Sequence, residues 1–178
     1  MEIITVKAKQ FKTFITYPKI EHRINELARR INEDYHGKVP LFLAILNGSF
    51  MFAADLFKFI EIDCAISFVK LASYKGTTST GNVINLIGMD ENVKDRHVVV
   101  LEDIVDTGRT LTNLLPGLEN QNPASLRIMS LLLKPDSMEF DIPIHYAGFE
   151  IPNEFIVGYG LDFDGYGRNL KDIYQIVE

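Results

Sequence analysis

The stretch Val98–Thr110 reads VVVLEDIVDTGRT, and it decides the fold class. Its first part is a continuous apolar run, which is typical of a strand buried on both faces of a parallel sheet. Two acids, Glu102 and Asp103, end this run, and the small polar residues Asp106–Thr110 follow as a turn. A helical pattern of leucines begins directly after the turn. A strand, a turn and a helix in this order form the repeating unit of an α/β sheet.

The turn itself has the composition of a phosphate site. Gly108 allows the backbone to approach a ligand closely. Free amides at the start of a helix point toward such a ligand, and the helix dipole favours a negative charge there. The hydroxyls of Thr107 and Thr110 add neutral donors. From the turn alone two interpretations stay open, a phosphate cradle or a helix start capped by Asp106 or Thr107.

The two acids favour a sugar phosphate as the ligand. Glu102 and Asp103 are expected just outside the carboxyl edge of the sheet, where open α/β sheets bind ligands. Carboxylates repel phosphate, but they accept hydrogen bonds from a sugar diol and hold a hard divalent cation. Beside a phosphate cradle they indicate a ribose 5-phosphate site, and the alternative is a solvated acidic loop. The dinucleotide-binding and P-loop fingerprints are both absent.

Outward from this stretch, apolar runs alternate with helical patterns. An amphipathic helix is predicted from Ile20 to Tyr35, and a second helix over Phe50–Ile60. The helix after the turn is expected to kink or end early at Pro116. Strands are predicted at Leu41–Leu46, Asp63–Ala72, Val83–Ile87, His97–Leu101, Leu126–Leu133, Ile144–Phe149, Phe155–Tyr159 and Ile173–Val177.

This order of elements predicts an α/β fold. Strands alternate with helices up to Leu133, which favours a twisted parallel sheet flanked by helices. Beyond Leu133 strands follow one another without helices, so this part is expected to form a small β-rich hood. We expect a single domain over residues 1–178, with the hood mainly at about 134–178 together with part of the N-terminus.

The net charge, the single cysteine and the length of the apolar stretches disfavour several classes of protein. The 178 residues include 18 Lys and Arg and 24 Asp and Glu, a formal charge of −6, which disfavours a general nucleic-acid surface. Cys64 is the only cysteine, so an intrachain disulfide scaffold is excluded, and its apolar surroundings predict a buried hydrophobic residue. The sequence contains neither a signal peptide nor an apolar stretch of membrane-spanning length. A cytoplasmic protein without a membrane partner is expected.

Residues 102–110, EDIVDTGRT, resemble the phosphoribosyl pyrophosphate (PRPP) signature of type I phosphoribosyltransferases, two acids followed by D-T-G-x-T. Other segments resemble one branch of that family, the hypoxanthine-guanine phosphoribosyltransferases. The segment Leu46-Asn47-Gly48-Ser49 is similar to the pyrophosphate loop of this branch. Ser73-Tyr74 and Ser79-Thr80-Gly81 are similar to its mobile catalytic loop. Lys134 and the segment GFEIPNEFIVGYGLDFDGYGRNL, residues 148–170, resemble its purine-binding region.

The resemblance implies a type I phosphoribosyltransferase fold and the Mg2+-dependent transfer of ribose 5-phosphate from PRPP to a 6-oxopurine. It places the 5-phosphate in the turn Asp106–Thr110, including Arg109. It places the ribose hydroxyls on Glu102 and Asp103, near one Mg2+. Asp106 is the candidate for handling the proton on purine N7.

The resemblance also implies roles for the C-terminal segment. Lys134 would contact the purine 6-oxo group, Phe155 would stack on the purine ring, and Ile156 would supply backbone groups to the purine edge. Asp162 would bind a second Mg2+, and Arg168 would contact pyrophosphate. Without the resemblance these residues indicate an ordinary strand-end lysine, a core phenylalanine and a solvated charged loop.

Two segments complete the implied site. A closing loop with Ser73 and Tyr74 would exclude water from the oxocarbenium-like centre, although its composition also fits a plain hairpin tip. The pyrophosphate loop Leu46, Asn47 and Gly48 departs from the branch, which usually has Lys at the position of Asn47. Pyrophosphate binding is then expected to rely on Lys70 or Arg168. The cis peptide of the family would fall at Leu46–Asn47.

The sequence is also compatible with two other functions. A PRPP-binding regulator of the same fold would act on nucleic acid, but it would need a basic surface. Another base, such as adenine or orotate, would place the chain elsewhere in the enzyme class. The expected partners are PRPP, a 6-oxopurine base and further copies of the chain, as a dimer or a tetramer.

Overall fold

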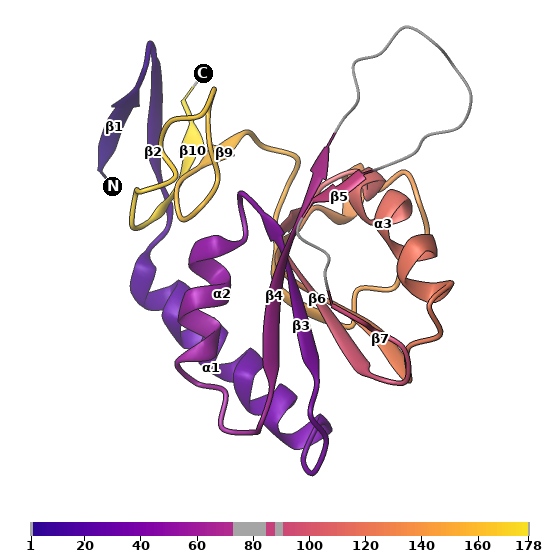
Figure 1. Ribbon diagram of the computed structural model, residues 1–178. Coiled ribbons are helices and arrows are strands. Elements are labelled where there is room, and N and C mark those ends of the chain that lie inside the picture. The colour runs from indigo at the N-terminus through magenta and orange to yellow at the C-terminus, as the bar shows by residue number, and fades with distance from the viewer. Residues whose placement is uncertain (1, 73–84, 88–90, 178) are drawn as a thin grey trace, which may run out of the picture.

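Two β-sheets organise the chain (Figure 1). The computed structural model describes residues 2–72, 85–87 and 91–177. The main sheet has the strand order β5-β4-β3-β6-β7-β8, and a smaller sheet has the order β1-β2-β10-β9. The strands of the main sheet are β3 (Leu41–Leu46), β4 (Ala65–Ala72), β5 (Asn85–Ile87), β6 (His97–Val105), β7 (Ser125–Leu133) and β8 (Tyr146–Glu150).

The two faces of the main sheet are covered by different helices. The helices are α1 (Tyr17–Asp34), α2 (Phe50–Phe57) and α3 (Arg109–Glu119). Phe42 and Ala44 of β3 pack in one core cluster with buried residues of α1 and α2. Leu41 and Leu43 pack in a second cluster with the leucines of α3. Both faces of β3 are therefore buried, which explains its continuous apolar sequence and confirms the predicted parallel sheet flanked by helices.

The smaller sheet joins the two ends of the chain (Figure 1). Its strands are β1 (Ile3–Val6), β2 (Lys9–Ile15), β9 (Ile156–Val157) and β10 (Ile173–Ile176), and all its pairings are antiparallel. Phe11, Val157 and Tyr174 form its own small core. The sheet lies above the carboxyl end of β3 (Figure 1), so it is placed as a hood over that edge.

Several elements differ from the sequence-based expectation. β8 pairs in parallel with β7 in the main sheet, not with the hood. The segment between them contains only a short 3-10 helix, η1 (Pro135–Ser137), so the expected βα alternation ends one strand before the parallel sheet does. Of the two alternatives at Pro116, a kink or an early end, the early end was wrong, because α3 continues through Pro116 to Glu119.

The strand predicted after the polar loop is present as β5, which pairs antiparallel with β4. Ser73 and Tyr74, and the loop tip as a whole, lie outside the described residues. Within the part of the chain that is described, no helix is long and apolar enough to cross a bilayer.

Candidate active site

The two acids lie within β6, not beyond its end. Glu102 is paired with Ser130 of β7 and is only 5% exposed. The expectation that both acids lie outside the sheet edge was wrong, because β7 continues alongside β6 as far as the pair Val105–Leu133. On its other side β6 loses its partner after the pair Ala44–Leu101. The acids therefore occupy a notch in the sheet that β3 leaves open.

Burial changes the acidity of this pair. Burial raises the pKa of Glu102 well above its ordinary value, and the neighbouring charge of Asp103 raises it further. Burial also raises the pKa of Asp103 to about 6, partly opposed by backbone hydrogen bonds and by the charge of Arg168. Among the described residues, neither acid has a basic side chain within salt-bridge distance. Such a pair gains stability from a bound cation or from hydroxyl donors.

The turn after β6 has the geometry expected for an anion site. Gly108 is the residue that precedes α3 and has a φ of 84°, a left-handed conformation that favours glycine. Gly108, directly before the helix, has no capping side chain, but the Arg109 N–H donates to Thr107 Oγ1 at 3.4 Å. The capping alternative is therefore wrong for Asp106 and holds through one long hydrogen bond for Thr107. The residues from Glu102 to Leu111, Thr110 included, line a pocket of about 250 Å³. The other amides at the helix start are available to a ligand.

The side chain of Arg109 is bound to Glu139. Its guanidinium donates to both carboxylate oxygens of Glu139, at 2.9 and 3.1 Å. The Glu139 N–H in turn donates to the Thr107 carbonyl at 3.0 Å. The segment around Glu139 therefore contacts the turn through both its backbone and its side chain. The charge of Arg109 is paired with the Glu139 carboxylate.

Lys134 is held inside the site. It is 6% exposed, and its Nζ donates to Asp106 Oδ2 at 2.8 Å and to Asn153 Oδ1 at 3.5 Å. Lys134 is therefore buried and paired with Asp106 rather than extended into solvent. Asn153 lies within the segment 148–170 that resembles the purine-binding region, but no role was predicted for it from the sequence. This cluster joins the turn to the segment that precedes β9.

The loop after β3 closes the notch beside the acids. Gly48 packs so tightly that a Cβ there would lie 1.7 Å from Asp103 Oδ2. The peptide Leu46–Asn47 is cis, as the resemblance implied. Leu46 is in register with Lys70 of β4, so the backbone of Lys70 lies alongside this loop. The structure thus brings the predicted loop residues next to the predicted acids.

The hood contributes a third group of residues. A Cβ at Gly160 would lie 2.1 Å from the Gly48 carbonyl oxygen, so the hood backbone touches the loop after β3. Arg168 donates to the Gly160 carbonyl at 2.7 Å and pairs with Asp162 at 2.5 Å. The charges of Arg168 and Asp162 both act on the pKa of Asp103. Asp162 and Arg168 are therefore paired with each other and lie near Asp103.

Two predicted purine contacts lie at the start of β9. Phe155 is 46% exposed, and its ring is 5.6 Å from that of Phe163 in an edge-on arrangement. It is therefore not a fully buried core residue, and part of its ring is open to a ligand. Ile156 is 6% exposed, so its side chain belongs to the core and only its backbone is available.

The carboxylate oxygens of the site are suited to a small number of hard cations. Within the described ranges, no group of three or more His, Cys, Asp or Glu is arranged to hold a metal ion. Mg2+ does not need such a cage, because it usually keeps several waters and binds one or two carboxylates together with substrate phosphates. Glu102 and Asp103 on one side and Asp162 on the other provide oxygens of this kind.

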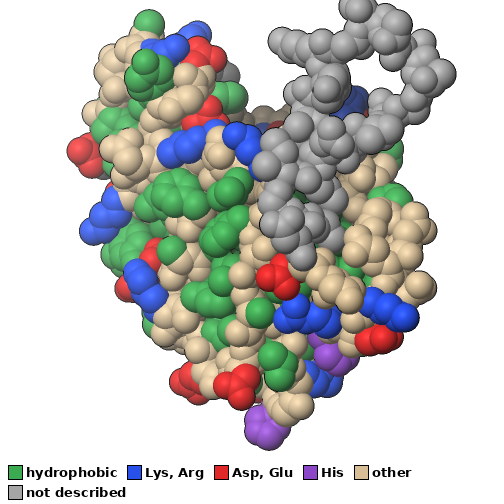
Figure 2. Space-filling view, in the orientation of Figure 1, with side chains coloured by type: hydrophobic (Ala, Val, Ile, Leu, Met, Phe, Trp, Pro, Cys, Tyr) green, Lys and Arg blue, Asp and Glu red, His purple; other side chains and the backbone are tan. Residues whose placement is uncertain are grey.

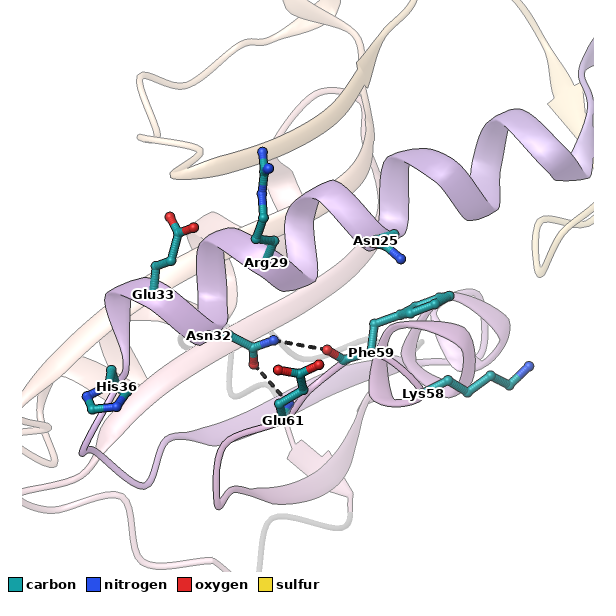
Figure 3. Close-up of a pocket in the computed structure, with 8 residues that line it drawn as sticks. All are labelled: Asn25, Arg29, Asn32, Glu33, His36, Lys58, Phe59 and Glu61. Atoms are coloured by element: carbon teal, nitrogen blue, oxygen red, sulfur yellow. Dashed lines mark hydrogen bonds between the residues drawn. The ribbon is translucent and has the colours of Figure 1, made fainter.

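A larger hollow lies elsewhere, between α1 and the segment after α2 (Figure 3). Its volume is about 820 Å³, and Asn32 spans it by bonding the Phe59 carbonyl and the Glu61 N–H, each at 3.0 Å. None of the predicted site residues lines it. Size alone therefore does not identify the site in this molecule.

Comparison with known proteins agrees with this geometry. The family model described as "Phosphoribosyl transferase domain" matches residues 12–164. The hypoxanthine-guanine phosphoribosyltransferase of Streptococcus pneumoniae strain R6 is 39% identical over 168 residues, 94% of this chain and 93% of its own. The hypoxanthine-guanine-xanthine phosphoribosyltransferase of Tritrichomonas foetus is 40% identical over 86% of this chain and 85% of its own.

Solved structures give the same result. A hypoxanthine-guanine phosphoribosyltransferase from Bacillus anthracis superposes with a TM-score of 0.85 at 38% identity, over 93% of this chain and 98% of the other. A hypoxanthine phosphoribosyltransferase from Staphylococcus aureus superposes with a TM-score of 0.86 at 35% identity, over 93% and 91%. The chain therefore belongs to the phosphoribosyl transferase domain family and, within it, to the hypoxanthine-guanine phosphoribosyltransferases.

Proposed function

We propose that the chain transfers the 5-phosphoribosyl group of PRPP to hypoxanthine or guanine. The products are inosine or guanosine monophosphate and pyrophosphate, a reaction of purine salvage. The observation that carries this proposal is the pocket between the acids of β6 and the start of α3, with the buried Lys134 amine held at its edge by Asp106. A phosphate cradle, a diol acceptor and a donor for an oxo group then lie within one site.

The phosphate end of PRPP is assigned to the turn. Backbone amides of Thr107–Thr110 and the hydroxyls of Thr107 and Thr110 bind the 5-phosphate, helped by the α3 dipole. Arg109 contributes its backbone amide, since its side chain is paired with Glu139. Glu102 and Asp103 accept hydrogen bonds from the ribose hydroxyls.

The proposed Mg2+ fits these residues. Glu102 and Asp103 would hold one ion and Asp162 a second, as hard oxygen ligands that become fully ionised next to a cation. When bound, Mg2+ neutralises charge on the pyrophosphate leaving group. The chain's own residues Arg168 and Lys70, with the backbone of Leu46, Asn47 and Gly48, bind that group directly.

The base is assigned to the other side of Asp106. Lys134 donates to the 6-oxo oxygen, and the Asp106 carboxylate accepts the proton that purine N7 loses as the new bond forms. Phe155 stacks on the ring, and the backbone at Ile156 meets its edge. Ser73 and Tyr74 are proposed to shield the reacting carbon from water.

The alternative of a nucleic-acid regulator has little support. The formal charge is −6, and Figure 2 shows Lys and Arg side chains interspersed with Asp and Glu rather than a continuous basic surface. A regulator would bind RNA with salt-sensitive affinity and without turnover. Purified protein should instead convert hypoxanthine, guanine or xanthine in the presence of PRPP and Mg2+. Competition among the three bases sets their order, and no turnover with any of them contradicts the proposal.

We also propose that the chain assembles with copies of itself. Figure 2 shows hydrophobic side chains on the surface over α2, and Phe50 of α2 and Phe68 of β4 are 42% and 41% exposed. Apolar surface of this kind is typical of an interface. Sedimentation equilibrium checks the proposal, and a monomer at micromolar concentration contradicts it.

A further inference from the structure

A buried carboxylate outside the site described above connects the hood to the main sheet. Asp55 of α2 is 8% exposed, although the helix around it is otherwise apolar. Its Oδ2 accepts a hydrogen bond from the Tyr159 hydroxyl at 2.6 Å, and its Oδ1 pairs with Lys58 Nζ at 2.6 Å. Burying a carboxylate costs free energy unless it is paired and hydrogen-bonded. Both of its oxygens are therefore committed to fixed partners.

Tyr159 is held in a backbone conformation that needs support. Its φ is 49°, left-handed, and it stands between Gly158 and Gly160 with φ of 102° and 96°. A non-glycine residue in this region is strained and persists where the surroundings fix it. The ring is 1% exposed and packs 6.2 Å from that of Tyr17. The Tyr159 hydroxyl donates its hydrogen bond to Asp55, and this bond fixes the side chain. The fixed side chain and the left-handed backbone of Tyr159 therefore stabilise each other.

The anchored segment leads directly to the site. Gly160, the next residue, touches the Gly48 carbonyl, and its own carbonyl accepts a hydrogen bond from Arg168. Asp162 follows two residues later and pairs with Arg168. On the other side, α2 begins immediately after the loop that contains Gly48. The Asp55–Tyr159 bond therefore closes a ring of contacts through α2, the loop after β3 and the hood.

We propose that Asp55 and Tyr159 are positioning residues for PRPP binding. Their hydrogen bond fixes the segment 158–162 against the loop after β3, and so sets where Asp162 and Arg168 stand relative to Asp103. The inference rests on the proposed function, because it assigns these two residues to the same site. Burial, and then the hydrogen bond to Asp55, raise the pKa of Tyr159 well above its ordinary value, so the phenol remains a donor at physiological pH.

The chain supplies a matched control. Tyr146 is also 1% exposed, and its hydroxyl donates to a carboxylate oxygen of Asp34 at 2.5 Å. This pair joins the end of α1 to the start of β8, away from the carboxyl edge. Tyr159→Phe and Tyr146→Phe each delete one hydroxyl from a buried Tyr–Asp bond, so both lose comparable stability. Only the first variant disturbs the segment that reaches the site.

The kinetic test separates positioning from stability. Tyr159→Phe should raise the KM for PRPP about tenfold, with a smaller effect on kcat, because a displaced binding group weakens substrate contacts. Tyr146→Phe should leave both constants near those of the unchanged protein. Asp55→Asn keeps an acceptor for the hydroxyl and should lie closer to the unchanged protein than Asp55→Ala. Equal effects of the two Tyr→Phe variants overturn the inference.

A second readout does not depend on turnover. The amides of Tyr159 and Gly160 donate to the carbonyls of Leu170 and Arg168, at 2.8 and 2.9 Å. In Tyr159→Phe their hydrogen exchange should accelerate about tenfold, and in Tyr146→Phe it should not change. Unchanged protection in Tyr159→Phe overturns the inference. If the wild-type protein shows no turnover, the proposed function fails. The hydrogen-exchange result then still tests whether the Asp55–Tyr159 bond fixes the segment 158–162.

Discussion

Individual residues in this site depend on close approaches that only one residue type permits. Gly48 touches the Asp103 carboxylate, and Gly108 takes the left-handed conformation that starts α3. The sequence indicated a glycine turn at Gly108 because a strand precedes it and a helix follows. It did not indicate the contact of Gly48 with Asp103, because the two are more than fifty residues apart in the chain.

Gly48→Ala tests the first close approach. The added Cβ would lie 1.7 Å from Asp103 Oδ2, so the loop or the acid must move. We expect PRPP affinity, measured by calorimetry, to fall about tenfold or more. Gly117→Ala is the matched control, because it lies in α3 with nothing within 4 Å of the new Cβ. It should keep full affinity and gain about 0.5–1 kcal/mol in the free energy of unfolding. Equal PRPP affinity in the two variants contradicts the assignment.

Asp106→Asn tests the proton-handling role. Asparagine keeps an oxygen for the hydrogen bond from Lys134 but is a far weaker base. Turnover should therefore fall about a hundredfold while the Kd for PRPP changes little. Single-turnover kinetics and calorimetry measure the two quantities separately. Equal losses in turnover and in PRPP affinity would refute the role.

Elements were predicted best where the sequence pattern is strong, as a continuous apolar run in β3 or a helical period in α1. β3 has the predicted bounds, Leu41–Leu46, and α1 was expected within three residues of its start. β6 was predicted four residues too short, because its last part contains acids that usually mark a strand end. The partner strand β7 keeps this part extended, and a single sequence does not reveal such long-range pairing. β8 was assigned to the hood for the same reason.

The junction of β7 and β8 should make stability depend on pH. The Ile128 N–H donates to His145 Nδ1 at 3.1 Å, which requires a neutral ring. Burial, and then the charge of Arg127, lower the pKa of His145 below its ordinary value. The unfolded chain therefore binds the proton more readily, and stability is lost as the pH falls through about 6.5.

Melting curves between pH 7.5 and 5.5 check this dependence. We expect Tm to decline by a few degrees over that range, and the decline to be smaller in His145→Gln. A glutamine oxygen can accept the same hydrogen bond without titrating. An identical decline in both proteins contradicts the role of His145.

The whole molecule combines two sheets around one edge. The main sheet supplies the turn Asp106–Thr110 and the two acids, and the hood supplies Asp162 and Arg168. The sequence predicted the fold class and the glycine turn from local patterns, and the candidate residues of the hood came from the family resemblance; the roles of the site residues stay predictions. It did not reveal Asn153, Asp55 or Tyr159, since their partners are set by how the hood packs on the sheet.

Because both sheets contribute to the site, ligand binding should stabilise the whole chain. PRPP with Mg2+ at about a hundred times its Kd should add roughly 2.7 kcal/mol to the free energy of unfolding. Urea titrations with and without EDTA measure the effect. Without the metal the gain should be much smaller, because buried carboxylates would then face uncompensated phosphate charge. Equal stabilisation in EDTA contradicts a role for the cation.

The central claim is the transfer of phosphoribose to a 6-oxopurine, and one measurement tests it most directly. Purified protein, PRPP, Mg2+ and hypoxanthine are mixed, and inosine monophosphate and pyrophosphate are quantified by chromatography. We expect equal amounts of the two products, with hypoxanthine required for pyrophosphate release. Absence of inosine monophosphate, or pyrophosphate release without the base, would contradict it.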